Sequence, residues 1–371
     1  MRVVMLVPAA FGGHGGIAQA LRDFIDALSR RADIDEIVVL PRTIHEPPGP
    51  LPPKVDFRAR AAGGKLAFAR ELIALALDRR GFDLALCGHL YLLPLLHLAL
   101  LGRRKPTGCF IYGVDAWASA DRTGEAWAIA RTGFMISSSR FTADRFSRWS
   151  GYDRRRALTM RHAVDRSRFT PGPRPAALIE RYGLAGRKVL MGLGRLDAND
   201  RYKGFDEVMA ALAGPLAHRQ NLSYLIAGDG SDRRRLEALA HALGIADRVI
   251  FAGFVPDAEK TDHYRLADCF LLAGWGEGFG IALIEAIACG VPSIASNLDA
   301  SAEAVGDGRV GQIVDPTDIP ALAAAIERAL ELPHGVVPDG FEEFWIESLE
   351  RRIDDRILRP LAAGLLPGEA V

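Results

Sequence analysis

The stretch Glu277-Gly-Phe-Gly-Ile-Ala-Leu-Ile-Glu285-Ala-Ile-Ala-Cys-Gly290 joins a short apolar run to an apolar helical segment through a glycine-rich loop. The apolar run, residues 269–272, has the length and composition of a buried strand. Residues 281–289 are long enough for a helix, and Gly290 is the kind of residue that often follows a last helical turn. A strand, a loop and a helix in this order predict one β–α unit of a parallel sheet.

This alternation of strand and helix extends through the chain on both sides of the stretch. Apolar runs of strand length, separated by helical patterns, occupy residues 3–7, 37–40, 84–87, 108–112 and 134–137, and then residues 189–193, 224–227, 249–251, 269–272 and 293–295. Such a series is typical of parallel sheets covered by helices on both faces. We therefore expect an α/β protein with two Rossmann-like, doubly wound domains that face a cleft, where such sheets bind ligands.

A proline-rich segment, residues 171–175, interrupts the series and marks the expected domain boundary. We expect an N-terminal domain over residues 1–168 and a linker over residues 169–178. A C-terminal domain is expected over residues 179–340, followed by a terminal segment over residues 341–371.

The charge of the chain is balanced overall but not along its length. The 371 residues include 46 Lys and Arg and 46 Asp and Glu, so the net charge is zero. Residues 1–165 carry 24 basic and 16 acidic side chains, whereas residues 166–371 carry 22 and 30. The basic first half is compatible with an anionic partner. The neutral total and the lack of a recognition motif argue against nucleic acid.

The cysteines and acidic pairs give no sign of a metal site. The four cysteines lie in apolar segments without C-x-x-C spacing: Cys87, Cys109, Cys269 and Cys289. We interpret them as reduced thiols of a cytoplasmic protein. The acidic pair Asp33-Ile-Asp35 has D-x-D spacing but precedes a strand, so we read it as a turn and expect no metal.

Two groups of residues have the chemistry of a phosphate site. Residues 12–16, Gly-Gly-His-Gly-Gly, lie between a strand and a helix and form part of a G-x-G-x-x-A pattern. Arg42 follows the second strand where an NAD site would place an acid, so only an NADP interpretation stays open. Arg195, after a strand, and Lys203, before a helix, could clamp a phosphate.

Residues 277–290 contain a third group with the chemistry of a phosphate site. Backbone amides of residues 279–281 would point at an anion at the start of the helix. Glu277 and Glu285 would flank that anion. Because a carboxylate repels a phosphate, we expect the two to bind neighbouring polar groups such as sugar and ribose hydroxyls.

Several segments of the sequence together resemble the motifs of one known enzyme family. The spacing from Glu277 to Glu285 resembles the E-x7-E motif of retaining glycosyltransferases of family 4, which have the GT-B architecture. Further segments resemble landmarks of that family in the same order: Gly15-Gly16, residues 137–140, Val164-Asp165, Gly194-Arg195, Lys203-Gly204, residues 227–230 and residues 248–255.

The resemblance implies a hexosyltransferase that moves a sugar from a UDP- or GDP-linked donor to a glycan or lipid-linked acceptor, in bacterial surface polysaccharide or glycoconjugate synthesis. Neither a metal nor another cofactor is implied. Residues 1–168 would be the acceptor side, residues 179–340 would bind the donor, and the last helix would pack back on the N-terminal domain.

The resemblance also implies roles for single residues. Glu277, Arg195 and Lys203 would be catalytic, the two cations by neutralising the leaving diphosphate and Glu277 by holding the donor sugar. Glu285 would hold the ribose. The remaining donor-binding residues would be Gly15, Gly16, Gly228, Phe254, Val255, Gly278, Phe279, Gly280 and Ile281.

Two positions depart from the family pattern. Tyr112 stands where the family often has a histidine near the sugar, and His162 replaces the usual Asn-Gly before Val164-Asp165. We retain Tyr112, Asp115 and His162 as sugar or acceptor contacts. Tyr112 keeps open a non-catalytic subunit that binds sugar nucleotides; a nucleotide-sugar epimerase and an NADP oxidoreductase are further alternatives.

The N-terminal half also has features of a membrane-surface protein. Residues 140–161 are rich in arginine. Residues 65–80 predict a helix with Leu66, Ile73 and Leu77 on one face and cations at both ends. Either this face packs on the core, or it contacts an anionic membrane. The expected location is therefore the cytoplasm, with peripheral contact at the inner face of the membrane.

Overall fold

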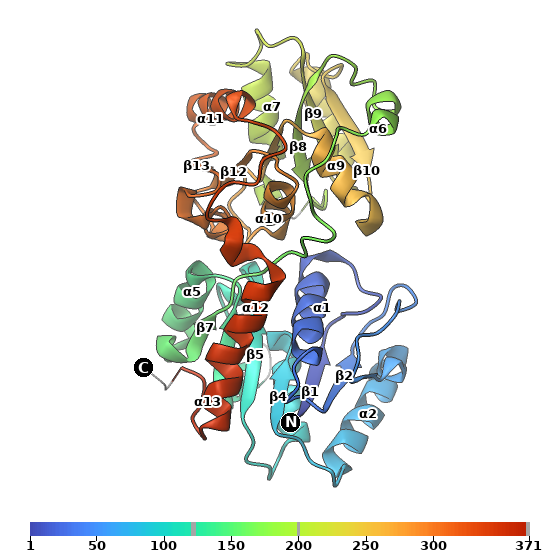
Figure 1. Cartoon of the computed structure of the whole chain (residues 1–371), viewed down its shortest axis with the longest axis vertical. Helices are drawn as coiled ribbons and strands as arrows, with labels where there is room; N and C mark the ends of the chain where they lie inside the picture. Colours follow the sequence, from blue (N-terminus) through green and yellow to red (C-terminus); the bar gives the residue numbers. More distant parts are fainter. Residues whose placement is uncertain (120–123, 199–200, 369–371) are drawn as a thin grey trace. The chain divides into compact units, whose positions relative to one another are not determined.

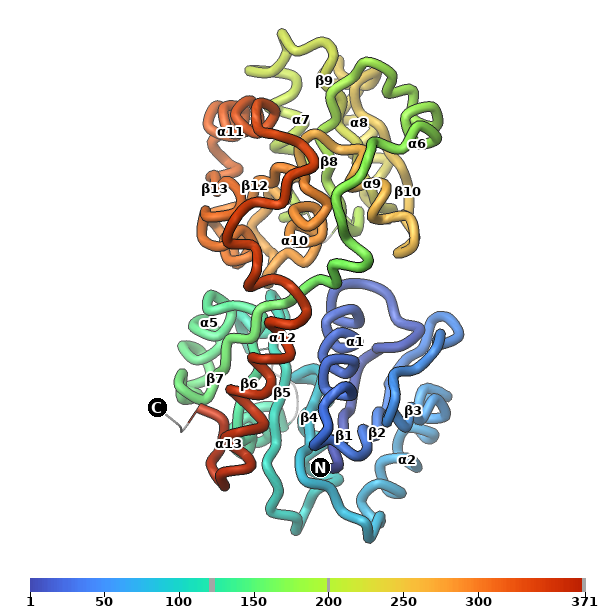
Figure 2. Tube along the Cα trace, viewed as in Figure 1, coloured from blue at the N-terminus to red at the C-terminus, as the bar shows by residue number. Residues whose placement is uncertain are grey.

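The computed structural model describes residues 1–119, 124–198 and 201–368. The chain forms two compact units (Figure 1). The first unit comprises residues 1–162 and 346–371, and the second comprises residues 163–345. Figure 2 traces the chain, which passes from the first unit to the second and returns near its end.

The first unit is built on a seven-stranded parallel sheet. Its strand order is β3-β2-β1-β4-β5-β6-β7. The strands are β1 (Arg2–Val7), β2 (Glu36–Pro41), β3 (Val55–Phe57), β4 (Leu84–Cys87), β5 (Thr107–Ile111), β6 (Phe134–Ser137) and β7 (Ala157–Thr159). The order reverses between β1 and β4, and such switch points are where open α/β sheets bind ligands.

Helices cover both faces of this sheet. The helices of the unit are α1 (Gly15–Ser29), α2 (Lys65–Leu77), α3 (Leu93–Ala99), α4 (Glu125–Arg131), α5 (Arg140–Ser150), α12 (Ile346–Ile353) and α13 (Arg359–Ala362). Helices α2 to α5 share one core with the strands. Helix α1 lies on the other face, where Phe24 meets Phe110 of β5 edge to face, and α12 contacts α1.

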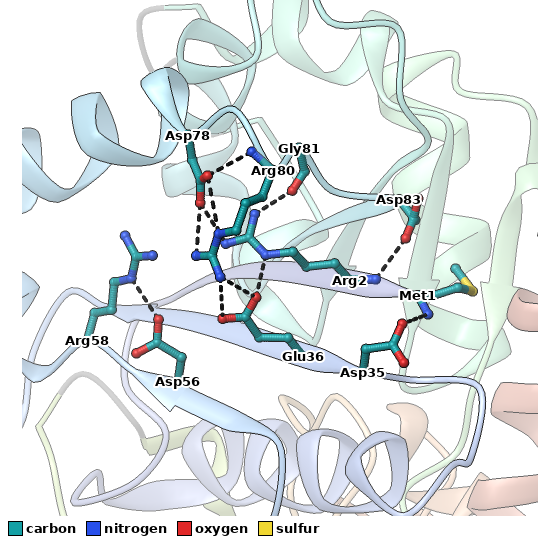
Figure 3. Close-up of polar contacts among 10 residues, drawn as sticks. All are labelled: Met1, Arg2, Asp35, Glu36, Asp56, Arg58, Asp78, Arg80, Gly81 and Asp83. Atoms are coloured by element: carbon teal, nitrogen blue, oxygen red, sulfur yellow. Dashed lines mark hydrogen bonds and ion pairs between the residues drawn. The ribbon is translucent and has the colours of Figure 1, made fainter.

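The amino-terminal edge of the first sheet is held by a polar network (Figure 3). The guanidinium of Arg2 on β1 bonds to Glu36 of β2 at 2.5 Å and to Asp78, beyond α2, at 2.8 Å. Asp35 accepts a hydrogen bond from the amino group of Met1 at 2.8 Å. The acidic pair that includes Asp35 therefore lies in a helix-to-strand turn, as the sequence predicts.

The second unit has a six-stranded parallel sheet. Its order is β10-β9-β8-β11-β12-β13. The strands are β8 (Lys188–Leu193), β9 (Leu222–Ala227), β10 (Val249–Gly253), β11 (Cys269–Leu271), β12 (Ser293–Ser296) and β13 (Gln312–Val314). The order reverses between β8 and β11, so the ligand crevice is expected beyond the carboxyl ends of these two strands.

The helices of the second unit pack on its sheet in two layers. They are α6 (Ala176–Arg181), α7 (Phe205–Ala213), α8 (Arg233–Ala242), α9 (Lys260–Leu266), α10 (Ile281–Ala288) and α11 (Ile319–Glu331). Helices α6, α9 and α10 share one core. Helices α7, α8 and α11 share the other.

The expected domain boundaries differ from those of the structure. The predicted linker, residues 169–178, is part of the second unit, because Phe169 and Leu178 are buried in its core. The predicted terminal segment also begins too early. Phe341 and Phe344 pack in the second unit, and the return to the first unit begins with α12 at Ile346.

Candidate functional site

The connections after β8 and β11 converge at the switch point of the second sheet. Gly204 lies in the first connection with φ of 79°, and a Cβ there would lie 1.6 Å from the carbonyl oxygen of Ala273. The amide of Trp275 donates to the carbonyl of Tyr202 at 2.9 Å. The two loops therefore touch backbone to backbone, which requires glycine at position 204.

Lys203 and Glu277 meet where these loops touch. The ammonium of Lys203 forms an ion pair with the carboxylate of Glu277. Their side chains are only 17% and 18% exposed. The residues expected to bind the diphosphate and the sugar are thus neighbours, and their charges neutralise each other.

Asp299 holds the backbone of Glu277, a role that the sequence analysis does not anticipate. Its carboxylate accepts from the amide of Glu277 at 2.8 Å and from the hydroxyl of Ser301 at 2.6 Å. The carbonyl of Glu277 accepts from the amide of Ala300 at 3.1 Å. Burial raises the pKa of Asp299 to about 6. In the sequence, Asp299 could have been found from its position three residues after β12, because β12 ends at the same edge of the sheet as β8 and β11.

Helix α10 begins beside this pair of charges. Gly280 precedes the helix with φ of 91°, and no side chain in the described part of the structure caps the helix. The first amides of α10, starting at Ile281, thus lack a side-chain acceptor, which suits an anion. Phe279 is 2% exposed and belongs to the core, so only its backbone is suited to contact a ligand.

Glu285 lies one turn into α10 and is almost completely buried. Its carboxylate accepts from the hydroxyl of Tyr264 on α9 at 2.6 Å and lies 3.8 Å from the ammonium of Lys260. Burial raises the pKa of Glu285, and the charge of Lys260 opposes that shift. Glu285 is therefore held by α9, whereas Glu277 is held by Lys203.

The other expected donor residues occupy the carboxyl ends of neighbouring strands. Arg195 is exposed after β8, and Gly228 follows β9, where a Cβ would lie 1.8 Å from the carbonyl oxygen of Gly194. Phe254 follows β10 and is 66% exposed, whereas Val255 is buried in the core. Gly278 is partly buried, between Glu277 and Phe279.

The first unit gathers polar side chains at the carboxyl ends of β4, β5 and β7. Tyr112 follows β5 and is 7% exposed, and its buried hydroxyl has no hydrogen-bond partner among the described residues. Its ring stacks on His162 with the centroids 6.4 Å apart. Burial and the charge of Arg352 lower the pKa of His162 to about 4, so its imidazole is neutral at pH 7.

His89 joins this group although the sequence analysis does not single it out. It follows β4 at the switch point of the first sheet and is 9% exposed. Its Nε2 lies 3.3 Å from the Asp115 carboxylate, whose other oxygen accepts from the amide of Gly113 at 2.9 Å. Two expected contacts, Tyr112 and Asp115, thus lie beside an imidazole from the neighbouring strand.

The glycine-rich loop of the first unit, residues 12–16, follows β1 and therefore lies at the same switch point. Gly15 and Gly16 begin α1 and are exposed. His14 precedes the helix and lies 3.3 Å from the carboxylate of Glu46. Among the residues that the structure describes, no group of three or more His, Cys, Asp and Glu side chains is arranged to hold a metal ion.

The second unit resembles a family of known proteins in sequence. The sequence profile of the family described as "Glycosyl transferases group 1" matches residues 179–341, which is nearly the whole second unit. Over these residues the chain is similar to this family. The loops of the candidate donor site, from Arg195 to Asp299, all lie inside the matched segment.

Curated relatives extend the similarity beyond the second unit. The GDP-mannose-dependent alpha-(1-6)-phosphatidylinositol monomannoside mannosyltransferase of Mycolicibacterium smegmatis is 36% identical over 204 residues, 53% of this chain and 52% of that protein. The D-inositol 3-phosphate glycosyltransferase of Geodermatophilus obscurus is 33% identical over 280 residues, 73% of this chain and 61% of that protein. The chain thus spans about half to three fifths of these relatives.

Solved structures show the fold. Sucrose-phosphate synthase from Thermosynechococcus elongatus superposes with a TM-score of 0.75 at 22% identity, covering 98% of this chain and 99% of that one. HepE of Anabaena in complex with UDP-glucose gives a TM-score of 0.75 at 18% identity, covering 97% and 100%. The α/β fold with two parallel sheets is the GT-B fold, as the sequence predicts.

Proposed function

We propose that the chain is a retaining glycosyltransferase that moves a hexose from a UDP- or GDP-linked sugar to a hydroxyl of a glycan or lipid-linked acceptor. One observation carries the proposal. The loops after β8 and β11 bring Lys203 and Glu277 together at the uncapped start of α10. This is a built site for an anion with a hydroxyl-rich neighbour, which describes a sugar diphosphate.

In the proposed reaction the bond between the anomeric carbon and the diphosphate breaks, and the acceptor oxygen forms a bond to that carbon. Lys203, Arg195 and the amides at the start of α10 stabilise the negative charge that develops on the leaving diphosphate. The acceptor proton passes to a diphosphate oxygen on the same face of the sugar, so the anomeric configuration is retained. These cations supply the charge compensation, and we propose that the reaction needs no metal or other cofactor.

The acidic residues are assigned to hydroxyl groups of the donor. When the diphosphate attracts Lys203, the Glu277 carboxylate becomes available to the hydroxyls of the donor sugar. Glu285, held by Tyr264, is assigned to the ribose. The backbone around Gly228, Phe254, Val255 and Gly278 completes the donor pocket. Because these last contacts come from backbone atoms, the side chains carry little information about the base.

The first unit is assigned to the acceptor and to one side of the sugar. Tyr112, Asp115 and His162 supply polar atoms there, and Gly15-Gly16 allow close approach of a ligand to the start of α1. The similarity of the second unit to glycosyl transferases favours this proposal over an NADP oxidoreductase and an epimerase. The proposed setting is bacterial surface polysaccharide or glycoconjugate synthesis in the cytoplasm, beside the inner face of the membrane.

A non-catalytic subunit that binds sugar nucleotides remains a second candidate, because Tyr112 replaces a family histidine. A transfer assay separates the two candidates. Wild-type protein is incubated with UDP- and GDP-sugars and a panel of glycan and lipid-linked acceptors, and the released nucleoside diphosphate is measured. Release that depends on Lys203 supports the enzyme. Tight binding of UDP or GDP without release from any donor supports the subunit.

A further inference from the structure

The outer surface of two helices in the first unit is unusually apolar. Helices α2 and α3 contact each other and bury residues in the same core cluster, so they lie side by side on one face of the sheet. Their opposite sides point away from that core. Folded chains rarely leave a contiguous row of large apolar side chains in water unless the row binds something.

Helix α2 carries three exposed apolar residues on this outer side. Leu66 is 78% exposed, Ile73 58% and Leu77 73%. Their spacing of seven and four residues places them on one helical face. Phe68 and Leu75 point to the opposite face and are buried in the core. Of the two predictions for this helix, packing of the Leu66–Ile73–Leu77 face on the core is therefore wrong.

Helix α3 and the turn after it continue the exposed surface. Leu98 is 54% exposed and Leu101 67%. The guanidinium of Arg103 donates to the carbonyl of Ala76 at 2.7 Å, which ties the end of α3 to the end of α2. Leu101 therefore lies at the end of the surface where Leu77 is found.

Exposed cations accompany these apolar residues. Lys65, Arg70, Arg79 and Arg104 are exposed and form no ion pair with a carboxylate in the described parts of the chain. The one acidic residue of α2, Glu71, lies 3.5 Å from Arg58 and 3.6 Å from Arg60.

Arg80 is also exposed but does not belong to this group of unpaired cations. It differs from its neighbours because Asp78 and Glu36 pair with it (Figure 3). The unpaired charge beside the apolar rows is therefore positive.

Three arginines of the arginine-rich segment 140–161 have partners within the first unit. Arg154 pairs with Asp144, and Arg155 pairs with Asp153 at 2.8 Å. The guanidinium of Arg156 donates to the carbonyl of Gly133 at 2.7 Å. These cations serve local contacts.

We propose that the outer face of α2 and α3 docks on an anionic lipid bilayer. The leucine and isoleucine side chains would enter the boundary between headgroups and acyl chains, and the cations would contact lipid phosphates. In the part of the chain that the structure describes, no helix is long and apolar enough to cross a membrane. The docking is peripheral and does not depend on the proposed sugar transfer.

The test is co-sedimentation of the full chain with vesicles of phosphatidylcholine alone or with 30% phosphatidylglycerol. We expect binding to the anionic vesicles, weakened by salt. The triple variant Leu66→Gln/Ile73→Gln/Leu77→Gln should lose roughly a hundredfold in affinity. Arg70→Gln/Arg79→Gln should lose roughly twenty-five-fold, at about fivefold per cation.

Control variants remove exposed residues of the same kinds elsewhere. Leu332→Gln/Val336→Gln and Arg148→Gln/Arg234→Gln should bind vesicles as the wild type does. Equal loss in surface and control variants would overturn the proposal, and so would a wild type that ignores anionic vesicles. The proposal would also be overturned if the wild type formed a dimer and the triple variant were a monomer. The apolar face would then bind a second copy of the chain and not a bilayer. Binding of UDP or GDP, measured in parallel, reports on the donor site separately.

Discussion

The Lys203 ammonium and the Glu277 carboxylate form an ion pair between two loops that are 74 residues apart in the sequence. The pair lies at the switch point of the second sheet and beside the start of α10. Both charges are largely withdrawn from water, so each depends on its partner. A ligand that brings a diphosphate and a sugar can satisfy both charges at once, whereas inorganic phosphate satisfies only Lys203.

Removing the cation should slow transfer strongly. The variant Lys203→Ala deletes one group that stabilises the leaving diphosphate, and loss of one such group costs about 10²–10³ in kcat. Steady-state kinetics with a donor that the wild type uses will measure this. Arg234→Ala, which removes an exposed cation of α8, is the control and should be within twofold of wild type. Comparable kcat values in the two variants would contradict the assigned role.

Removing the carboxylate should separate nucleotide binding from transfer. In Glu277→Gln the charge of Lys203 is no longer neutralised, so UDP or GDP should bind as tightly as in the wild type or more tightly. Transfer should still fall, because the charged contact to the donor sugar is lost. Isothermal titration and the transfer assay measure the two effects. Parallel losses of affinity for the free nucleotide and of kcat would argue against a sugar contact.

Asp299 should make the stability of the second unit depend on pH. Its folded-state pKa of about 6 lies above the usual value of 3.8, so the native state binds the extra proton. Stability should therefore fall as pH rises from about 4 to about 6, by about 3 kcal/mol at most, and then level off.

The variant Asp299→Asn is the comparison for this titration. It also loses the acceptor for the amide of Glu277, so it should be less stable at pH 4.5. The gap between the urea midpoints of wild type and variant, measured from pH 4.5 to 7, should narrow as pH rises. A constant gap would show that Asp299 does not titrate in this range.

The variant Tyr112→Phe should show whether the Tyr112 hydroxyl binds a ligand or stabilises the fold. Its buried hydroxyl has no partner in the described structure, so Tyr112→Phe should leave the thermal stability unchanged or raise it by about 1 kcal/mol. Transfer should fall if that hydroxyl meets the substrate. Tyr152→Phe is the opposite control, because the Tyr152 hydroxyl donates to the carbonyl of Thr132 at 2.9 Å. It should lose about 1 kcal/mol and keep its activity.

The sequence singled out the two loops that meet in the folded chain, because glycine, strand and helix signals coincide around Gly280 and Gly204. It did not find the strands β3, β7 and β13, because each has three residues and includes a polar one, so none forms a continuous apolar run. It set the domain boundary at the prolines, although Phe169 and Leu178 belong to the second core. Asp299 and His89 were not singled out because their partners, Glu277 and Asp115, are brought to them only by the folded sheet edges.

The central claim is that Lys203 and Glu277 bind a sugar diphosphate for transfer. The most direct test follows the proton NMR signal of the anomeric hydrogen while the chain acts on UDP- and GDP-linked hexoses with an acceptor. We predict that one donor is consumed, that the product has the same anomeric configuration as that donor, and that Lys203→Ala slows the reaction at least a hundredfold. A wild type that binds UDP or GDP but consumes no donor, or a product of inverted configuration, would contradict the account.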